Sequence, residues 1–99
     1  MREEHEIIVR SRHEVVALPG ISLPELARLC DCQLAVARLL VEIGLLEPIR
    51  AGAEPLFSSW SVVRLRKALR LRRDLHLNFD AVALVMELLD RIEELERGR

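Results

Sequence analysis

Signals that begin and end helices divide most of this chain into helical segments. The stretch ISLPELARLC has Ser22 as a candidate N-cap, Pro24 in the first turn and Glu25 three residues after the serine. This order is a capping box, which predicts the start of a helix. A second helix is expected from about residue 33 to 43, because its apolar residues recur at helical spacing and Gly44 supplies a C-terminal cap. Two short helices joined by a tight turn predict a helix-turn-helix unit.

Two longer helices are expected downstream of this unit. Ser58 or Ser59 is placed to cap a helix that ends near Leu77, and Asn78 is placed to cap the last helix, predicted over residues 79–97. Between the second and third helices, the stretch IRAGAEPLF combines proline, glycine and small residues, which predicts a loop or a tight hairpin. We therefore predict a mainly α fold.

A single domain is expected over residues 21–99, preceded by an N-terminal extension over residues 1–20. Within the extension, EIIVR is compatible with a short strand, whereas RHEVVAL fits either a helix or an extended segment. The first residues, MREEHEII, are too acidic for a signal peptide, and no apolar run approaches the roughly 20 residues that span a membrane. These features favour a cytoplasmic protein.

The composition supports a helical core made of aliphatic side chains. Hydrophobic residues make up 51% of the chain, which argues against disorder. The aromatic residues are only Phe57, Trp60 and Phe79. The core must therefore consist mainly of leucine and valine side chains that interdigitate between helices.

Residues with possible metal or catalytic chemistry are few. Cys30 and Cys32 form a CxC pair, which supplies only two of the four ligands of a structural zinc site, and the three histidines are scattered. We interpret the cysteines as a buried residue and a turn residue, and no metal or cofactor is implied. Ser58 and Ser59 have no histidine placed to activate them, and the common catalytic motifs are missing. The sequence favours a protein that is not an enzyme.

The stretch VVRLRKALRLRRDL carries six cations and no acid before Asp74, although the whole chain has a net charge of -1. We call these six residues the basic ladder: Arg64, Arg66, Lys67, Arg70, Arg72 and Arg73. From Asp74 to Arg97 the charge reverses, with seven acids and two arginines. We expect part of the basic ladder to pair with these acids, or with Glu25, Glu42 or Glu47 of the first unit, and the arginine stems to cover apolar surface.

The last helix has more apolar surface than one contact with its own domain needs. One stripe has 3-4-3 spacing, and a second one, formed by Leu84, Leu88 and Leu95, lies about 100° away around the helix. We predict that one stripe forms a homodimer interface, although both stripes could instead face a single wide groove. The residues predicted for the dimer interface are Val82, Val85, Leu89 and Ile92.

The order of helix-turn-helix, wing-like loop and two further helices resembles the MerR-type winged-helix domain. The stretch ELARLC…LLVEIGLLEP is similar to the opening of that domain and to its exit into the wing. The stretch RLRKALRLRRDLHLNFDAVALVMELLDRIEELE resembles the chaperone modulator family CbpM. The resemblance implies a MerR-like winged helix with a short wing hairpin or loop and a C-terminal dimerisation helix. The last helix is shorter than in many members, at about 30 Å.

The CbpM resemblance also implies a function. Members of that family bind the J-domain of the DnaJ-like co-chaperone CbpA and restrain its co-chaperone action and its DNA binding. J-domains present a basic helix, so an acidic patch would orient such a partner. On the last helix, Glu87, Asp90 and Glu94 lie on one stripe and are the predicted partner-binding residues, although an ordinary solvated face would have the same appearance.

The alternative is a MerR-like transcription regulator that binds DNA. The candidate contacts are Gln33, Arg38, Arg66, Lys67, Arg70 and Arg73. A DNA-reading helix carries polar and basic residues toward the bases, but here Glu42 lies on that helix and Glu54 in the wing, where each would repel phosphate. The arginine and tyrosine residues typical of MerR DNA binders are also missing. These departures argue against direct nucleic-acid binding. A dimeric adaptor with an unknown partner is a third reading.

Overall fold

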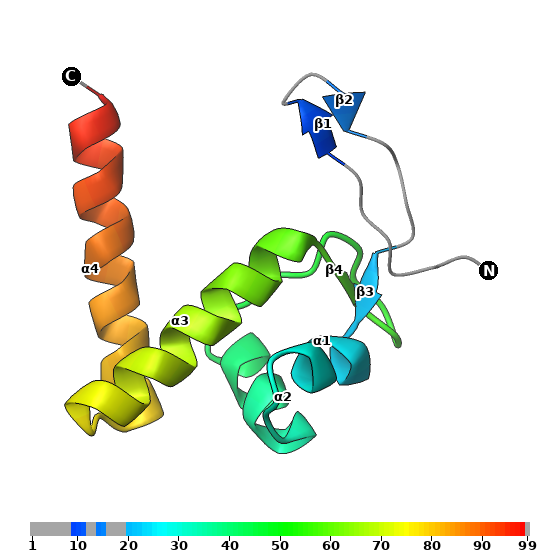
Figure 1. Cartoon of the computed structure of the whole chain (residues 1–99), viewed down its shortest axis with the longest axis horizontal. Coiled ribbons are helices and arrows are strands. Elements are labelled where there is room, and N and C mark those ends of the chain that lie inside the picture. The colour runs from blue at the N-terminus through cyan, green and yellow to red at the C-terminus, as the bar shows by residue number, and fades with distance from the viewer. Residues whose placement is uncertain (1–8, 12–13, 16–19, 99) are drawn as a thin grey trace.

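The computed structural model describes residues 9–11, 14–15 and 20–98, and within them four helices account for most of the chain (Figure 1). The predicted mainly α fold is confirmed. The helices are α1 (Leu23–Leu29), α2 (Leu34–Glu42), α3 (Ser59–Leu75) and α4 (Phe79–Arg97). The strands are β1 (Val9–Ser11), β2 (Glu14–Val15), β3 (Ile21–Ser22) and β4 (Leu56–Phe57).

Side-chain caps begin three of the helices, as the sequence predicted. The Ser22 hydroxyl accepts a hydrogen bond from the backbone N–H of Glu25 at 3.2 Å, which is half of the expected capping box. Ser58 caps α3 in the same way, and Asn78 Oδ1 accepts from the N–H of Ala81 at 2.8 Å at the start of α4. These local contacts satisfy backbone donors that the first turn of a helix leaves free.

Left-handed residues separate the helices and correct one predicted boundary. Gly44, with a φ of 86°, follows α2 as expected. His76 has a φ of 55° and serves as the C-cap of α3. The helix therefore ends at Leu75, two residues earlier than the predicted end near Leu77.

A short sheet, which the sequence did not predict, joins β4 at the end of the wing to β3 at the start of the domain. β3 and β4 pair antiparallel, with Ile21 opposite Phe57, and an isolated bridge joins Arg50 to Leu56. The segment between Arg50 and Leu56 is thereby closed into a small hairpin. Gly20 lies close to β4: a Cβ there would lie 3.1 Å from the carbonyl oxygen of Phe57, and its φ is 98°. Both facts favour glycine at this position.

The core is built around α1, which packs on α2, α3 and β4, and it extends to the first half of α4 through the packing of α4 on α3. Its largest fully buried side chains are Phe57, Leu26, Leu40, Leu46, Leu65, Met86 and Val82. All are aliphatic except one phenylalanine and one methionine, as the scarcity of aromatic residues predicted. The second half of α4 extends away from this core (Figure 1).

The described part of the N-terminal extension is extended chain. β1 and β2 pair antiparallel, with Val9 opposite Val15. The first residues of EIIVR and most of RHEVVAL lie outside the described residues. Across the described part of the chain, no helix is long and apolar enough to cross a membrane.

Candidate functional site

An ion pair joins α3 to α4. The Nη1 atom of Arg64 lies 3.3 Å from Oδ1 and 3.2 Å from Oδ2 of Asp90, and its Nε atom donates to the carbonyl oxygen of Leu45 at 3.0 Å. One guanidinium therefore links the last helix to the turn that follows α2. This finding confirms the expectation that part of the basic ladder pairs with the acidic helix.

Two cavities adjoin this ion pair and share Gly44, Leu45, Arg64 and Asp90. One has a volume of about 470 Å³ and extends past Glu47 and Ile49 to Trp60. The other has a volume of about 340 Å³ and extends past Ile43 and Ala83 to Glu87. We call the two together the Arg64–Asp90 groove.

The three predicted partner-binding residues occupy different surroundings. Glu87 is exposed and lines the Arg64–Asp90 groove. Asp90 also lines it, but Arg64 already engages its carboxylate. Glu94 is exposed on the second half of α4 and does not line the groove. The fold thus brings Glu87 and Asp90 together in one concave surface and leaves Glu94 outside it.

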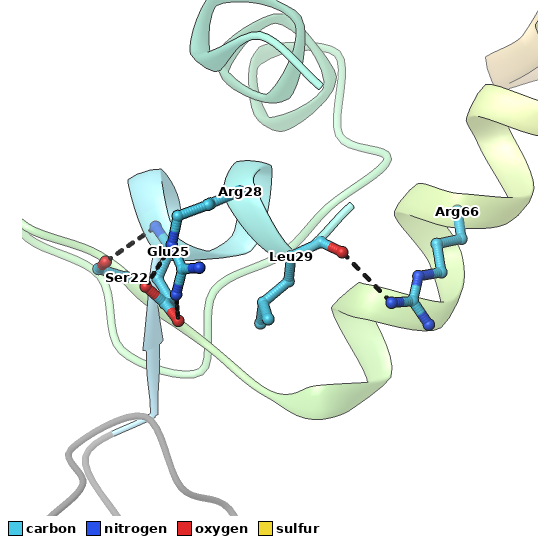
Figure 2. Close-up of polar contacts among 5 residues, drawn as sticks. All are labelled: Ser22, Glu25, Arg28, Leu29 and Arg66. Atoms are coloured by element: carbon cyan, nitrogen blue, oxygen red, sulfur yellow. Dashed lines mark hydrogen bonds and ion pairs between the residues drawn. The ribbon is translucent and has the colours of Figure 1, made fainter. Parts of the chain in front are cut away.

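Two arginines of the basic ladder donate hydrogen bonds to backbone carbonyls at or just beyond the ends of helices. Arg66 reaches from α3 to the carbonyl oxygen of Leu29, the last residue of α1, at 3.2 Å (Figure 2). Arg72 donates to the carbonyl oxygen of Leu77 at 2.9 Å, and its guanidinium lies 4.6 Å from the centre of the Phe79 ring. The carbonyl of Leu29 has no partner within α1, and that of Leu77 lies in the turn after α3, so the arginines stabilise the end of α1 and the turn between α3 and α4.

The other cations of the ladder face solvent. Arg73 pairs with its neighbour Asp74, while Lys67 and Arg70 are exposed and make no ion pair with any residue that the structure describes. The six cations therefore do not form one free basic surface. This arrangement fits the reading of the ladder as mainly structural.

Two of the six candidate DNA contacts, Gln33 and Arg38, lie at the start of α2 and within it. Gln33 is the exposed N-cap residue of α2 and makes no capping hydrogen bond with its side chain. Arg38 is exposed and lines a cavity of about 540 Å³ between the first two helices and the wing. That cavity is also lined by Glu42 and Glu54, so two carboxylates accompany its single cation. Phosphate would be repelled there.

The structure corrects the predicted dimer interface at one position. Val82 is fully buried in the core of its own chain, as is Met86, because this face of α4 packs on α3. Val82 is therefore unavailable to a second copy, and Val85 is half-buried. The exposed apolar stripe of α4, as we call it below, consists of Leu84, Leu88, Leu89, Ile92 and Leu95.

The two cysteines are free thiols in protected surroundings. The Cys30 Sγ atom lies 3.7 Å from the carbonyl oxygen of Val62. Burial raises the pKa of the Cys30 thiol, and nearby Arg66 opposes part of that rise. Burial also raises the pKa of Cys32, with smaller contributions from Cys30 and Asp31. Among the described residues, no group of three or more potential ligands could hold a metal ion.

Comparison with known families identifies the fold. The model of the MerR helix-turn-helix family of regulatory proteins matches residues 21–98. The chain belongs to this family. The paired helices α1 and α2, the wing hairpin and α3 are thus the MerR-type winged helix that the sequence pattern indicated. The members of this family are regulatory proteins.

This MerR-family chain is similar in sequence to a chaperone modulator. The chain is 37% identical over 57 residues to the chaperone modulatory protein CbpM of Pseudomonas entomophila (strain L48). The match covers 57% of this chain and 56% of the relative, so it spans little more than half of either protein. The resemblance to CbpM is confirmed. No solved structure matches the chain.

Sequence reasoning missed most of the residues that line the Arg64–Asp90 groove. Trp60 follows the α3 cap and precedes Arg64 by one helical turn, so the two side chains share a face of α3. That spacing could have predicted that Trp60 lies beside Arg64 on the surface of α3. Glu47 and Ile49 carry no such signal, because an irregular connection places them.

Proposed function

We propose that this protein is a non-enzymatic regulator that acts in the cytoplasm. It binds the J-domain of a DnaJ/CbpA-type co-chaperone and restrains that protein's co-chaperone and DNA-binding activity. The observation that carries the proposal is the similarity to the chaperone modulatory protein CbpM. The mechanism is competition, in which the regulator covers the J-domain surface that the DnaK chaperone would otherwise use.

The charges on the surface support a protein partner over DNA. Glu87, which makes no ion pair with a described residue, lies beside Asp90 in a concave surface that suits a basic partner. The helix that would read DNA has two carboxylates beside its cavity, and Arg66 holds a backbone carbonyl. We assign partner binding to Glu87 and Asp90, which line the groove, and to Glu94, which lies outside it on the same helix.

We also propose that the protein is a homodimer joined through the exposed apolar stripe of α4. Leu95 is 68% exposed in the single chain, and Leu88 and Ile92 are about half exposed. Such a row is typical of a surface that a partner covers. Of the four residues predicted for the interface, Leu89 and Ile92 belong to this exposed stripe, and the half-buried Val85 lies at the edge of the stripe.

The test is a binding titration of the full chain against a purified J-domain of a CbpA-type co-chaperone. Charge reversal by Glu87→Lys with Glu94→Lys is expected to weaken binding, whereas Glu93→Lys with Glu96→Lys, on another face of the same helix, is the matched control. Asp90 is better changed to asparagine, because a lysine there would repel Arg64. Wild-type protein that does not bind the J-domain would refute the proposed function, and equal affinities of both double variants would refute only the site.

A MerR-type DNA-binding regulator is the second candidate. The observation in its favour is that Lys67 and Arg70 are exposed and make no ion pair within the described residues. Duplex DNA titrated at two salt concentrations tests it, because phosphate contacts lose affinity steeply as salt rises. Salt-sensitive DNA affinity without J-domain binding would favour this candidate.

A further inference from the structure

We propose that the Arg64–Asp90 groove binds a cationic helix of a partner protein and that Trp60 is its apolar anchor. The identity of the partner rests on the proposed function, under which the helix belongs to the J-domain. The chemistry of the groove is independent of that assignment and can be tested separately.

The charges that line the groove select a cationic occupant. Glu47, Glu87 and Asp90 face one cation, Arg64, so the lining has an excess of two negative charges. Arg64 is already committed to Asp90 and to the carbonyl of Leu45. Glu47 and Glu87, one in each half of the groove, make no ion pair with a described residue and are available to a partner's cations.

Trp60 gives the groove an apolar end. Trp60 is 59% exposed, and Ile49, which lines the same cavity, is 56% exposed. Tryptophan is enriched among the residues that dominate binding energy at protein interfaces, because it buries a large apolar area while its N–H can stay hydrogen-bonded. Trp60 and Ile49 are thus exposed beside the carboxylates of Glu47 and Asp90. This arrangement suits a helix that has cations on one face and an apolar residue next to them.

The walls of the groove favour a helix over an extended peptide. They come from α3, α4 and the connection that follows α2, and neither β3 nor β4 contributes a residue. An extended peptide normally gains affinity by pairing with an open strand edge, whereas a helix docks by placing side chains into a groove. Because no strand edge lines the groove, the groove suits a helix and not an extended peptide.

Trp60 reports directly on occupation of the groove because it is the only tryptophan in the chain. The probes are a purified J-domain of a CbpA-type co-chaperone and a designed Lys/Leu helical peptide, both without tryptophan. We expect each to shift the Trp60 emission to shorter wavelength and to saturate it. By calorimetry, Trp60→Ala should weaken binding at least about tenfold, the usual scale for an interface anchor.

Matched controls separate the groove from general effects. Leu75 is 54% exposed on α3 and lies outside the groove, so Leu75→Ala should bind as wild type. Glu47→Lys should weaken binding more at low than at high salt, while Glu54→Lys in the wing should not. Circular dichroism confirms that each variant is folded.

The outcomes distinguish this inference from the proposed function. J-domain binding with an unchanged Trp60 emission and an unaffected Trp60→Ala variant would overturn the groove and leave the proposed function intact. A response to the peptide but not to the J-domain would support the groove and refute the proposed function. An emission shift that depends only on the concentration of the protein itself would assign the groove to a second copy and overturn the inference.

Discussion

Arg64 and Asp90 form the ion pair that joins the middle of α4 to α3, with Nη1 3.2 Å from Oδ2. The side chain of Arg64 is 19% exposed and that of Asp90 is 42% exposed, so the pair is partly shielded from water. It lies in the middle of the Arg64–Asp90 groove. Its removal should therefore affect both stability and partner binding.

We expect Arg64→Met to cost more stability than Asp90→Asn. The aspartate change removes only a partly exposed ion pair, worth about 0.5–1 kcal/mol. The arginine change also removes the hydrogen bond to the carbonyl of Leu45, for a total of about 2 kcal/mol. Urea unfolding of both variants and of the double variant measures these values. A larger loss for Asp90→Asn than for Arg64→Met would contradict this order.

Arg72→Ala is expected to lower the free energy of unfolding by about 1–2 kcal/mol. The variant loses the hydrogen bond to Leu77 and the contact with the Phe79 ring, which together hold the turn between α3 and α4. Arg70→Ala is the matched control, because Arg70 is exposed on the same helix and makes no ion pair with a described residue. Thermal unfolding should show a clear decrease for the first variant only. Equal melting temperatures for both would refute a structural role for Arg72.

Leu88→Glu should convert a dimer into a monomer. Leu88 is in the middle of the exposed apolar stripe of α4, and a buried carboxylate there would have no partner to offset its desolvation. Leu75→Glu adds the same charge at an exposed leucine of α3, away from the stripe. Sedimentation equilibrium measures the mass of each. If wild-type protein is already monomeric, the proposed interface is wrong.

The cysteine thiols should make stability fall at alkaline pH. Burial raises the pKa of Cys30 and Cys32 above the ordinary value of 9.0, so the folded protein keeps their protons to higher pH than the unfolded chain does. Their contribution is fully present below about pH 9 and is lost as the pH rises through the folded-state pKa values. Urea unfolding at pH 8 and pH 10 should show a larger decrease for wild type than for the Cys30→Ala/Cys32→Ala variant. An identical decrease in both proteins would contradict the assignment to the thiols.

Features that depend on neighbours a few residues apart could be predicted from the order of residues in the chain. Ser22, Ser58 and Asn78 cap helices because a side-chain oxygen reaches a backbone N–H two or three residues ahead. Gly44 ends α2 because a left-handed residue is needed directly after the helix. The family pattern was readable for the same reason, since it consists of short stretches in a fixed order.

Which helix surfaces meet could not be predicted in the same way, because it depends on how the helices pack. The last helix offers apolar residues around much of its circumference, and periodicity alone does not say which side packs on α3. The approach of α3 buries Val82 and Met86 and leaves Leu88 and Ile92 exposed. In the same way, the carbonyls that Arg64 and Arg66 hold belong to segments 19 and 37 residues away, and the lining of the groove depends on an irregular connection. Such contacts depend on how helices cross in space, which no spacing of residues along a single helix records.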